Sequence, residues 1–120
     1  MSEGVSVSVV VPTYNRAALL GECLDSLLNQ DRRPEEILVV DDGSSDGTPD
    51  VVRSKDGPVR YLRQENAGKA AALNRALAAV SGEAVWIVDD DDLAPPDALV
   101  RLTAAIETGP GTDLVYGGFC

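Results

Sequence analysis

Four consecutive carboxylates, Asp89 to Asp92, are the part of the sequence best suited to chemistry. They follow the apolar segment 84–88, so a buried strand is expected to lead directly into them. Adjacent carboxylates repel one another unless a cation lies among them. Oxygen ligands select hard ions such as Mg²⁺ or Mn²⁺, which keep positions open for water and phosphate oxygens. The alternative is a solvated acidic turn before the helix that starts near Pro95, but the position at a strand end favours a metal site.

Other residues could contact a nucleotide. Asp41 and Asp42 follow a second apolar strand, where a carboxylate can accept hydrogen bonds from a base N–H or from ribose hydroxyls. Capping of the next helix is an equally supported role for this pair. Tyr14 follows the first apolar strand and could stack on a nucleobase or pack over the edge of the sheet. Lys69 lies in the first turn of a predicted helix, where it could neutralise a phosphate or be solvated.

Composition excludes several classes of function. The chain has 120 residues, 20 acidic and 10 basic, no histidine and a formal net charge of -10. Such a charge disfavours binding to DNA or RNA, and the lack of histidine excludes a Ser-His-Asp triad and leaves acid–base chemistry to carboxylates, Lys, Tyr or Cys. Cys23 and Cys120 form neither a disulfide framework nor a CxxC site, which fits a reducing compartment. Since residues 1–4 do not resemble a signal peptide and no apolar run approaches the length of a membrane span, we expect a cytoplasmic chain.

The elements that must position these side chains alternate between strand and helix. Apolar, β-branched segments predict strands at 5–11 (ending at Pro12), 37–40, 59–62, 84–88 and 114–116. Helices are expected at 17–29, after Pro49, at 70–80 (with 81–82 as C-cap) and from 95–97 onward. This alternation predicts one α/β domain with a doubly wound, mainly parallel sheet, helices on both faces and an edge strand at 59–62. The chain ends just after the fifth strand, so we expect a fold truncated there.

In such a sheet, ligands bind outside the carboxyl ends of the strands. The polar segments 12–15, 41–44 and 89–92 all lie at these ends. The first strand is not followed by GxGxxG, and Gly68-Lys69-Ala70 lacks the other residues of a P-loop. A bound nucleotide would therefore need another source of positive charge, which a metal at Asp89 to Asp92 would supply.

Taken together and in this order, the segments resemble the family 2 glycosyltransferases, which have the GT-A fold. The resemblance rests on segments 9–16, 39–48, 66–74, 82–83, 89–92 and 96–97, and thus covers nearly the whole chain. It implies that residues 1–120 are the nucleotide-sugar-binding part of a single GT-A domain, with the acceptor half beyond Cys120. The segment 68–74 is closest to that of members similar to polysaccharide synthases.

The resemblance also implies roles for individual residues. Asp91 would be the ligand of Mn²⁺ or Mg²⁺, and this metal would bridge the diphosphate and act as a Lewis acid for the leaving group. Asp89 would lie nearer the ribose or the donor sugar, and Asp42 would accept a hydrogen bond from the base. The nucleotide-sugar-binding residues would be Pro12, Thr13, Tyr14, Asp41, Asp42, Lys69, Asp89 and Asp90.

The activity implied by the resemblance is metal-dependent transfer of a sugar, with inversion, from a nucleotide-diphosphate sugar to an acceptor hydroxyl. UDP-sugars are the commonest donors in the family, and the acceptor would be a glycan, a lipid-linked molecule or another hydroxyl compound. The carboxylate base and any parts that associate with a membrane surface would lie beyond Cys120. The 120 residues alone are therefore expected to be inactive.

Three other classes of protein are rival interpretations of the sequence. One is a non-catalytic module that binds a nucleotide or cation within a larger assembly. A receiver-type signalling domain would need an acid pair after the first strand and a lysine after the fifth, and the sequence has neither. A nucleotidyltransferase would need a glycine-rich first loop, but no glycine lies between Val5 and Leu20.

Overall fold

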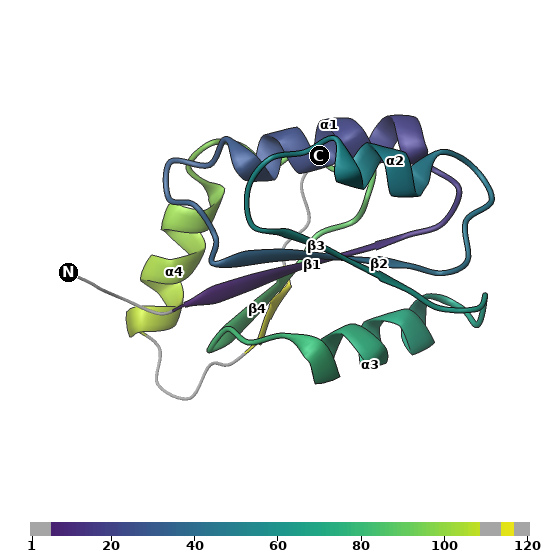
Figure 1. Cartoon of the computed structure of the whole chain (residues 1–120). Coiled ribbons are helices and arrows are strands. Elements are labelled where there is room, and N and C mark those ends of the chain that lie inside the picture. The colour runs from purple at the N-terminus through teal and green to yellow at the C-terminus, as the bar shows by residue number, and fades with distance from the viewer. Residues whose placement is uncertain (1–5, 109–113, 117–120) are drawn as a thin grey trace.

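The computed structural model describes residues 6–108 and 114–116 (Figure 1). Its strands and helices alternate along the chain as the apolar pattern predicts. They are β1 (Val7–Thr13), α1 (Ala17–Leu28), β2 (Glu36–Asp41), α2 (Thr48–Arg53), β3 (Val59–Arg63), α3 (Lys69–Ala79), β4 (Ala84–Ile87), α4 (Ala98–Thr108) and β5 (Leu114–Tyr116).

The strands form a parallel sheet in the order β3-β2-β1-β4-β5, in which β5 is a short strand beside β4. The chain runs outward from β1 through β2 to β3, which is an edge strand as predicted, and then crosses to β4 on the other side of β1. The order of the strands therefore reverses between β1 and β4. In open α/β sheets this is where ligands bind.

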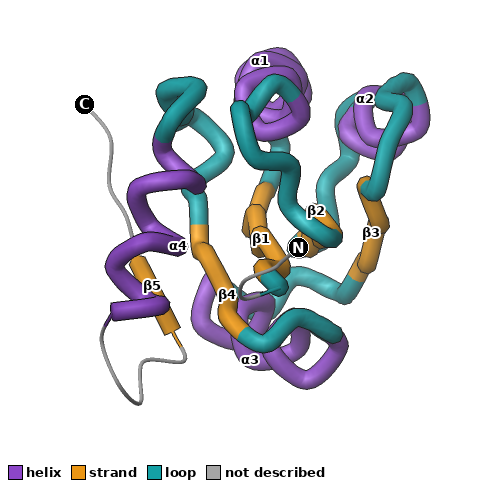
Figure 2. Tube along the Cα trace, turned by 90° about the vertical axis from the view of Figure 1, so that its left-hand side faces the viewer, coloured by secondary structure: helices purple, strands orange, loops and turns teal. Residues whose placement is uncertain are grey.

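Helices cover both faces of the sheet, as expected from strands that are apolar on both sides. α1 and α2 lie on one side and α3 lies on the other (Figures 1 and 2). Alternate β1 residues serve the two cores, since Val9 and Val11 pack with Leu24 and Trp86, whereas Val10 packs against the α3 side. Within the described residues, no helix is long and apolar enough to cross a membrane.

β1 extends two residues beyond Val11, where the sequence predicted that Pro12 would stop it. Pro12 pairs with Val40 of β2, and Thr13 pairs with Asp41. Pairing with β4 has already ended by then, since its last residue pair is Val10 with Ile87. The missing N–H of Pro12 therefore leaves no gap in a ladder, and proline is tolerated in this central strand.

α3 ends at Ala79, and Val80 is already extended, so residues 81–82 are not the helical C-cap predicted from the sequence. Gly82 is required for a different reason. A Cβ at this position would lie 2.6 Å from Ser8 Oγ and 2.7 Å from Ser8 N. The glycine thus allows the start of β4 to approach β1 closely.

A buried polar cluster closes the amino end of the strands, opposite the carboxyl ends. Glu36 Oε2 accepts hydrogen bonds from Ser8 Oγ (2.5 Å), Ser81 N (2.6 Å) and Ser81 Oγ (2.9 Å), and Glu36 Oε1 accepts one from Arg60 Nη1 (2.6 Å). Burial raises the pKa of Glu36, but these hydrogen bonds outweigh burial and lower the pKa to about 2. The ionised carboxylate therefore joins β1, β2, β3 and the segment after α3.

Glu36→Gln is expected to destabilise the chain at pH 7 by about 2–3 kcal/mol, because a group with a lowered folded-state pKa stabilises the fold only while ionised. This contribution is present above the unfolded-state pKa of about 4.5 and is lost as the pH falls toward 2. Urea unfolding at several pH values measures it. The two chains should differ at pH 7 and converge near pH 2, and Glu22→Gln, at an exposed position of α1, is the control. A difference that persists at pH 2 would contradict this account.

Candidate functional site

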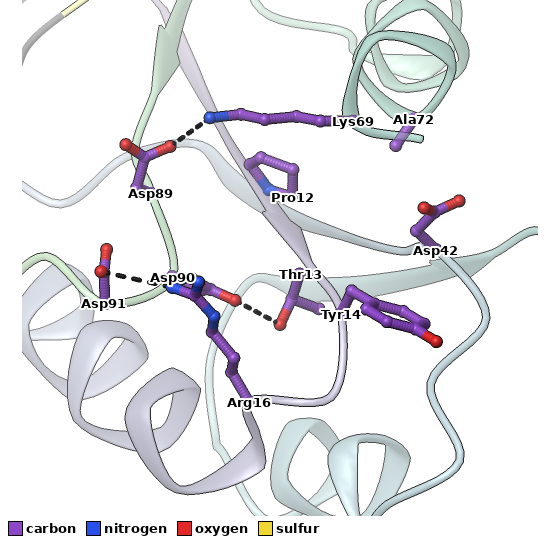
Figure 3. A pocket seen from close by; sticks show the side chains of 10 residues that line it. All are labelled: Pro12, Thr13, Tyr14, Arg16, Asp42, Lys69, Ala72, Asp89, Asp90 and Asp91. Carbon is purple, nitrogen blue, oxygen red and sulfur yellow. Dashed lines mark hydrogen bonds and ion pairs between the residues drawn. The ribbon is translucent and has the colours of Figure 1, made fainter. Parts of the chain in front are cut away.

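A cleft of about 500 Å³ opens at the carboxyl ends of β1, β2 and β4, beside the start of α3 (Figure 3). It lies at the reversal of strand order, where the sequence predicted a site. Eight of the predicted site residues line it, together with Arg16 and Ala72, for which no role was predicted: Pro12, Thr13, Tyr14, Asp42, Lys69, Asp89, Asp90 and Asp91.

The connection from β1 to α1 presents Tyr14 to the cleft. Asn15 adopts a left-handed backbone conformation (φ 52°), which asparagine tolerates better than most residues. Asn15 N donates to Ser44 Oγ (2.8 Å), and Asn15 Oδ1 accepts from Ser45 N (2.8 Å), so the turn is held against the loop after β2. Tyr14, the residue before this turn, is 49% exposed.

The carboxylates of the acid loop, residues 89–92, divide into two groups. Oxygens of Asp89, Asp91 and Asp92 all lie within 4.8 Å of one another, a group able to hold a metal ion. Asp90 is instead buried and accepts a hydrogen bond from Thr13 Oγ1 (2.8 Å). Burial raises the pKa of Asp90, while the Thr13 hydroxyl opposes this rise. The predicted ligand Asp91 thus lies in a set that also contains Asp92, a member of the predicted acidic run for which no individual role was expected. Asp90 joins the loop to the end of β1.

Two cations contact the acid loop from different elements. Lys69 Nζ, at the start of α3, lies 2.7 Å from Asp89 Oδ1. Arg16 Nη1, just before α1, lies 3.3 Å from both Asp90 Oδ1 and Asp91 Oδ2. The sequence contained a signal for Arg16, since it directly precedes a helix at the expected binding edge.

α1 and the residues directly after it support the acid loop and the segment that follows that loop. Cys23 Sγ lies 3.5 Å from the Asp89 carbonyl oxygen, and Ser26 Oγ accepts from Ala94 N (3.1 Å). Gln30 Nε2 donates to Pro95 O (2.7 Å), and Gln30 Oε1 accepts from Leu99 N (2.9 Å) at the start of α4.

The thiol of Cys23 is a core group. Burial, with a smaller contribution from Asp90, raises its pKa to about 12, so it stays protonated at neutral pH. The prediction that Cys23 belongs to the core is confirmed, whereas Cys120 lies outside the described residues.

Asp42 both lines the cleft and anchors the loop between β3 and α3. Its Oδ1 accepts from Gln64 Nε2 (2.8 Å) and Ala67 N (2.8 Å), and its Oδ2 accepts from Gly68 N (3.0 Å) and Asn66 Nδ2 (3.2 Å). The hydrogen bond from Gln64, followed by those from Ala67 and Gly68, lowers the pKa of Asp42, and burial opposes this shift. A base N–H could join this carboxylate only by sharing or displacing one of these donors.

Asp41 does not line the cleft, unlike the other predicted site residues. It is fully buried and accepts hydrogen bonds from the Tyr61 hydroxyl (2.5 Å) and Ser44 N (2.9 Å). Arg63 Nη1 lies 3.4 Å from the same carboxylate. Asp41 holds the turn after β2 through its hydrogen bond with Ser44 N. The neighbouring Asp42 faces the cleft.

The chain matches the model of one known protein family over most of its length. The model of the family described as "Glycosyl transferase family 2" matches residues 8–119, which include every site residue described above and all the strands and helices except the first residue of β1. The chain belongs to glycosyl transferase family 2. The resemblance seen in the sequence is thereby confirmed.

Family 2 relatives and solved structures are similar over most of this chain. Glycosyltransferase GlyG of Streptococcus pneumoniae is 37% identical over 117 residues, which cover 94% of this chain and 38% of GlyG. The mannosyltransferase PcManGT of Pyrobaculum calidifontis, solved in complex with GDP-Man and Mn²⁺, is 42% identical with a TM-score of 0.75, over 85% of this chain and 32% of that one. S. aureus TarS 1–349, in complex with UDP-GlcNAc, is 34% identical with a TM-score of 0.79, over 86% and 31%.

These family 2 structures confirm the predicted α/β architecture as GT-A-like. The 120 residues span little more than a third of GlyG and about a third of the two solved chains. The matched part of each relative is therefore the part that corresponds to the sheet and cleft described here.

Asp42→Ala is expected to destabilise this family 2 chain by about 1–3 kcal/mol, because it leaves several donors of the 64–68 loop without their acceptor. Amide hydrogen exchange at Ala67 and Gly68 should accelerate, since both N–H groups donate to Asp42. Asp50→Ala is the control, because Asp50 is 81% exposed in its ion pair with Arg53. If exchange at Ala67 and Gly68 stayed as slow as in the unaltered chain, Asp42 would not be the anchor of this loop.

Proposed function

We propose that this chain is the donor-binding and metal-binding part of an inverting glycosyltransferase, which transfers a sugar from a nucleotide-diphosphate sugar, a UDP-sugar in the first instance, to an acceptor hydroxyl. The observation that carries the proposal is the cleft itself. A cluster of carboxylates, two cations and an exposed tyrosine lie together there, at the reversal of strand order. Support comes from relatives whose structures hold GDP-Man with Mn²⁺ and UDP-GlcNAc.

The nucleoside would occupy the side of the cleft formed by β1 and β2. Tyr14 offers an exposed ring face for stacking on a base, and Asp42 offers carboxylate oxygens to a base N–H. Pro12 and Thr13 form the adjoining wall. Asp41 would act through the turn that carries Asp42 rather than through contact with the ligand.

The acid loop suits a hard divalent cation. Asp89, Asp91 and Asp92 provide carboxylate oxygens close enough to share one ion, and such all-oxygen donor sets fit Mn²⁺ or Mg²⁺. When bound, the cation would supply Lewis-acid stabilisation for the charge that develops on the diphosphate leaving group. Thr13 would hold Asp90, and with it the loop, in place.

Inversion at the anomeric carbon also requires an oriented acceptor and a base within hydrogen-bond reach. The carboxylates that line the cleft are committed to the metal group, to Thr13 or to the 64–68 loop. We therefore assign the base and the binding of a glycan, lipid-linked or other hydroxyl acceptor to residues beyond these 120, along with any contact with a membrane surface. The cytoplasmic location stays a prediction.

A non-catalytic module that binds a nucleotide or cation within a larger assembly is the second candidate. The observation that favours it is that the carboxylates lining the cleft already have partners in the two cations, in Thr13 or in the 64–68 loop, so none of them is assigned as a base. Both candidates bind the nucleotide, and only the first requires transfer once acceptor-binding parts are present.

UDP is expected to bind on the order of tenfold more tightly in the presence of Mn²⁺, because a cation at the acid loop offsets the charge of the diphosphate. Uridine, which lacks phosphate, should bind equally with and without the metal. Calorimetric titrations of both ligands measure the difference. Equal UDP affinity in the two conditions would exclude a metal bridge.

Asp91→Asn tests the site of that metal. The effect of Mn²⁺ on UDP affinity should be largely lost at the same Mn²⁺ concentration. Loss of a ligand should weaken Mn²⁺ binding by at least about tenfold, which is what the loss of a residue that merely orients a ligand costs. Asp50→Asn, an exposed position on α2, should leave the effect unchanged.

The 120 residues alone are expected to show no transfer and no donor hydrolysis above background, because the oriented acceptor and the base are assigned elsewhere. The assay uses a sample that has first been shown to bind UDP with Mn²⁺, so that inactivity does not reflect misfolding. Turnover comparable to that of full-length GlyG would place the base within residues 1–120 and contradict this division of roles.

A further inference from the structure

Both cations that line the cleft are paired with carboxylates of the acid loop. Lys69 Nζ lies 2.7 Å from Asp89 Oδ1, and Arg16 Nη1 lies 3.3 Å from Asp91 Oδ2. Figure 3 shows the two side chains reaching the loop from opposite sides of the cleft. Because Lys69 begins α3 and Arg16 precedes α1, the two ion pairs join separate helices to the same loop.

The paired carboxylates are two of the three that could hold a metal ion. Asp89 and Asp91 belong to the group whose oxygens lie within 4.8 Å of one another, so a divalent cation would bind beside the oxygens that Lys69 and Arg16 already contact. Like charges this close to one another repel. The protein's own cations and the metal therefore compete for Asp89 and Asp91.

The side chains of Lys69 and Arg16 lie at the surface of the cleft and are long enough to reach another anion within it. Their side chains are 53% and 50% exposed, and both line the cleft in which the diphosphate would lie. Exposed ion pairs of this kind are individually weak, so exchanging one anionic partner for another costs little.

We propose that Lys69 and Arg16 are internal counterions of the metal site: they neutralise Asp89 and Asp91 in the ligand-free protein and pair with the diphosphate when a divalent cation takes these carboxylates. The inference rests on the proposed function. It makes the binding of metal and of diphosphate mutually dependent through the protein's own side chains, in addition to any direct contact between metal and phosphate. By linkage, each ligand strengthens the other by the same factor.

This arrangement has a signature that a purely structural ion pair lacks. Removing Lys69 should strengthen binding of the metal alone, since a competitor is lost, and should weaken binding of UDP in the presence of metal, since a phosphate partner is lost. A residue that only held the loop in shape would weaken both. The opposite signs are therefore the diagnostic result.

The experiment measures Mn²⁺ binding without nucleotide, by the electron paramagnetic resonance signal of free Mn²⁺, and UDP binding at saturating Mn²⁺, by calorimetry. For Lys69→Met we expect Mn²⁺ affinity to rise on the order of tenfold and UDP affinity to fall by a similar factor. Arg16→Met should change both affinities in the same directions. Arg53→Met is the matched control, because it also removes one positive charge from an exposed ion pair, that with Asp50 on α2.

The outcomes separate this inference from the proposed function. If Lys69→Met leaves Mn²⁺ affinity unchanged or lowers it, while the unaltered chain still binds UDP in a Mn²⁺-dependent way, the counterion role is wrong and the proposed function stands. An equal rise in Mn²⁺ affinity in Arg53→Met would also overturn the counterion role, because the change in net charge alone would then explain the rise. If the unaltered chain binds neither Mn²⁺ nor UDP, both proposals fail.

Discussion

The cleft depends on the point at which two adjacent parallel strands stop pairing. β1 and β4 pair from Val7 with Ala84 to Val10 with Ile87, while β1 continues beside β2 for three more residues. Beyond the last pair, a side-chain hydrogen bond from Thr13 to Asp90 replaces the ladder. The space between the diverging strands is where Pro12, Tyr14 and the acid loop lie together. A ladder that continued past Val10 would place backbone where the ligand site is.

The charges of the molecule are arranged differently at the two ends of the sheet. At the amino end, Glu36 is buried and accepts hydrogen bonds from Ser8, Ser81 and Arg60, so its charge joins strands. At the carboxyl end, Asp89 and Asp91 are more exposed, and their partners are flexible side chains on the surface of the cleft. Strong, buried pairing suits a scaffold, and weak, exposed pairing suits groups that exchange partners with a ligand.

The architecture could be predicted from the sequence because apolar periodicity is a local signal. The position of the site followed from the rule that the carboxyl ends of parallel strands share one edge. Which of Asp41 and Asp42 faces the cleft could not be predicted, since the end of β2 decides which carboxylate points into the core and which points out. The partners of Arg16, Glu36 and Gln30 could not be predicted either, because these contacts join positions that are 24 to 75 residues apart in the sequence. Pro12 was misjudged for the same reason, since its place in β1 depends on where β4 stops pairing.

The connection between β1 and α1 consists of only Tyr14, Asn15 and Arg16, and both of its ends are held. Asn15 is fixed against the loop after β2. α1 contacts the acid loop through Cys23, and Gln30, directly after α1, contacts the start of α4. Successive residues of an α-helix are rotated by about 100° around its axis. An insertion or deletion of one residue in this connection would therefore turn Arg16 away from the acid loop, or would turn the supporting face of α1 away from it. The number of residues between β1 and α1 is constrained as tightly as their identity.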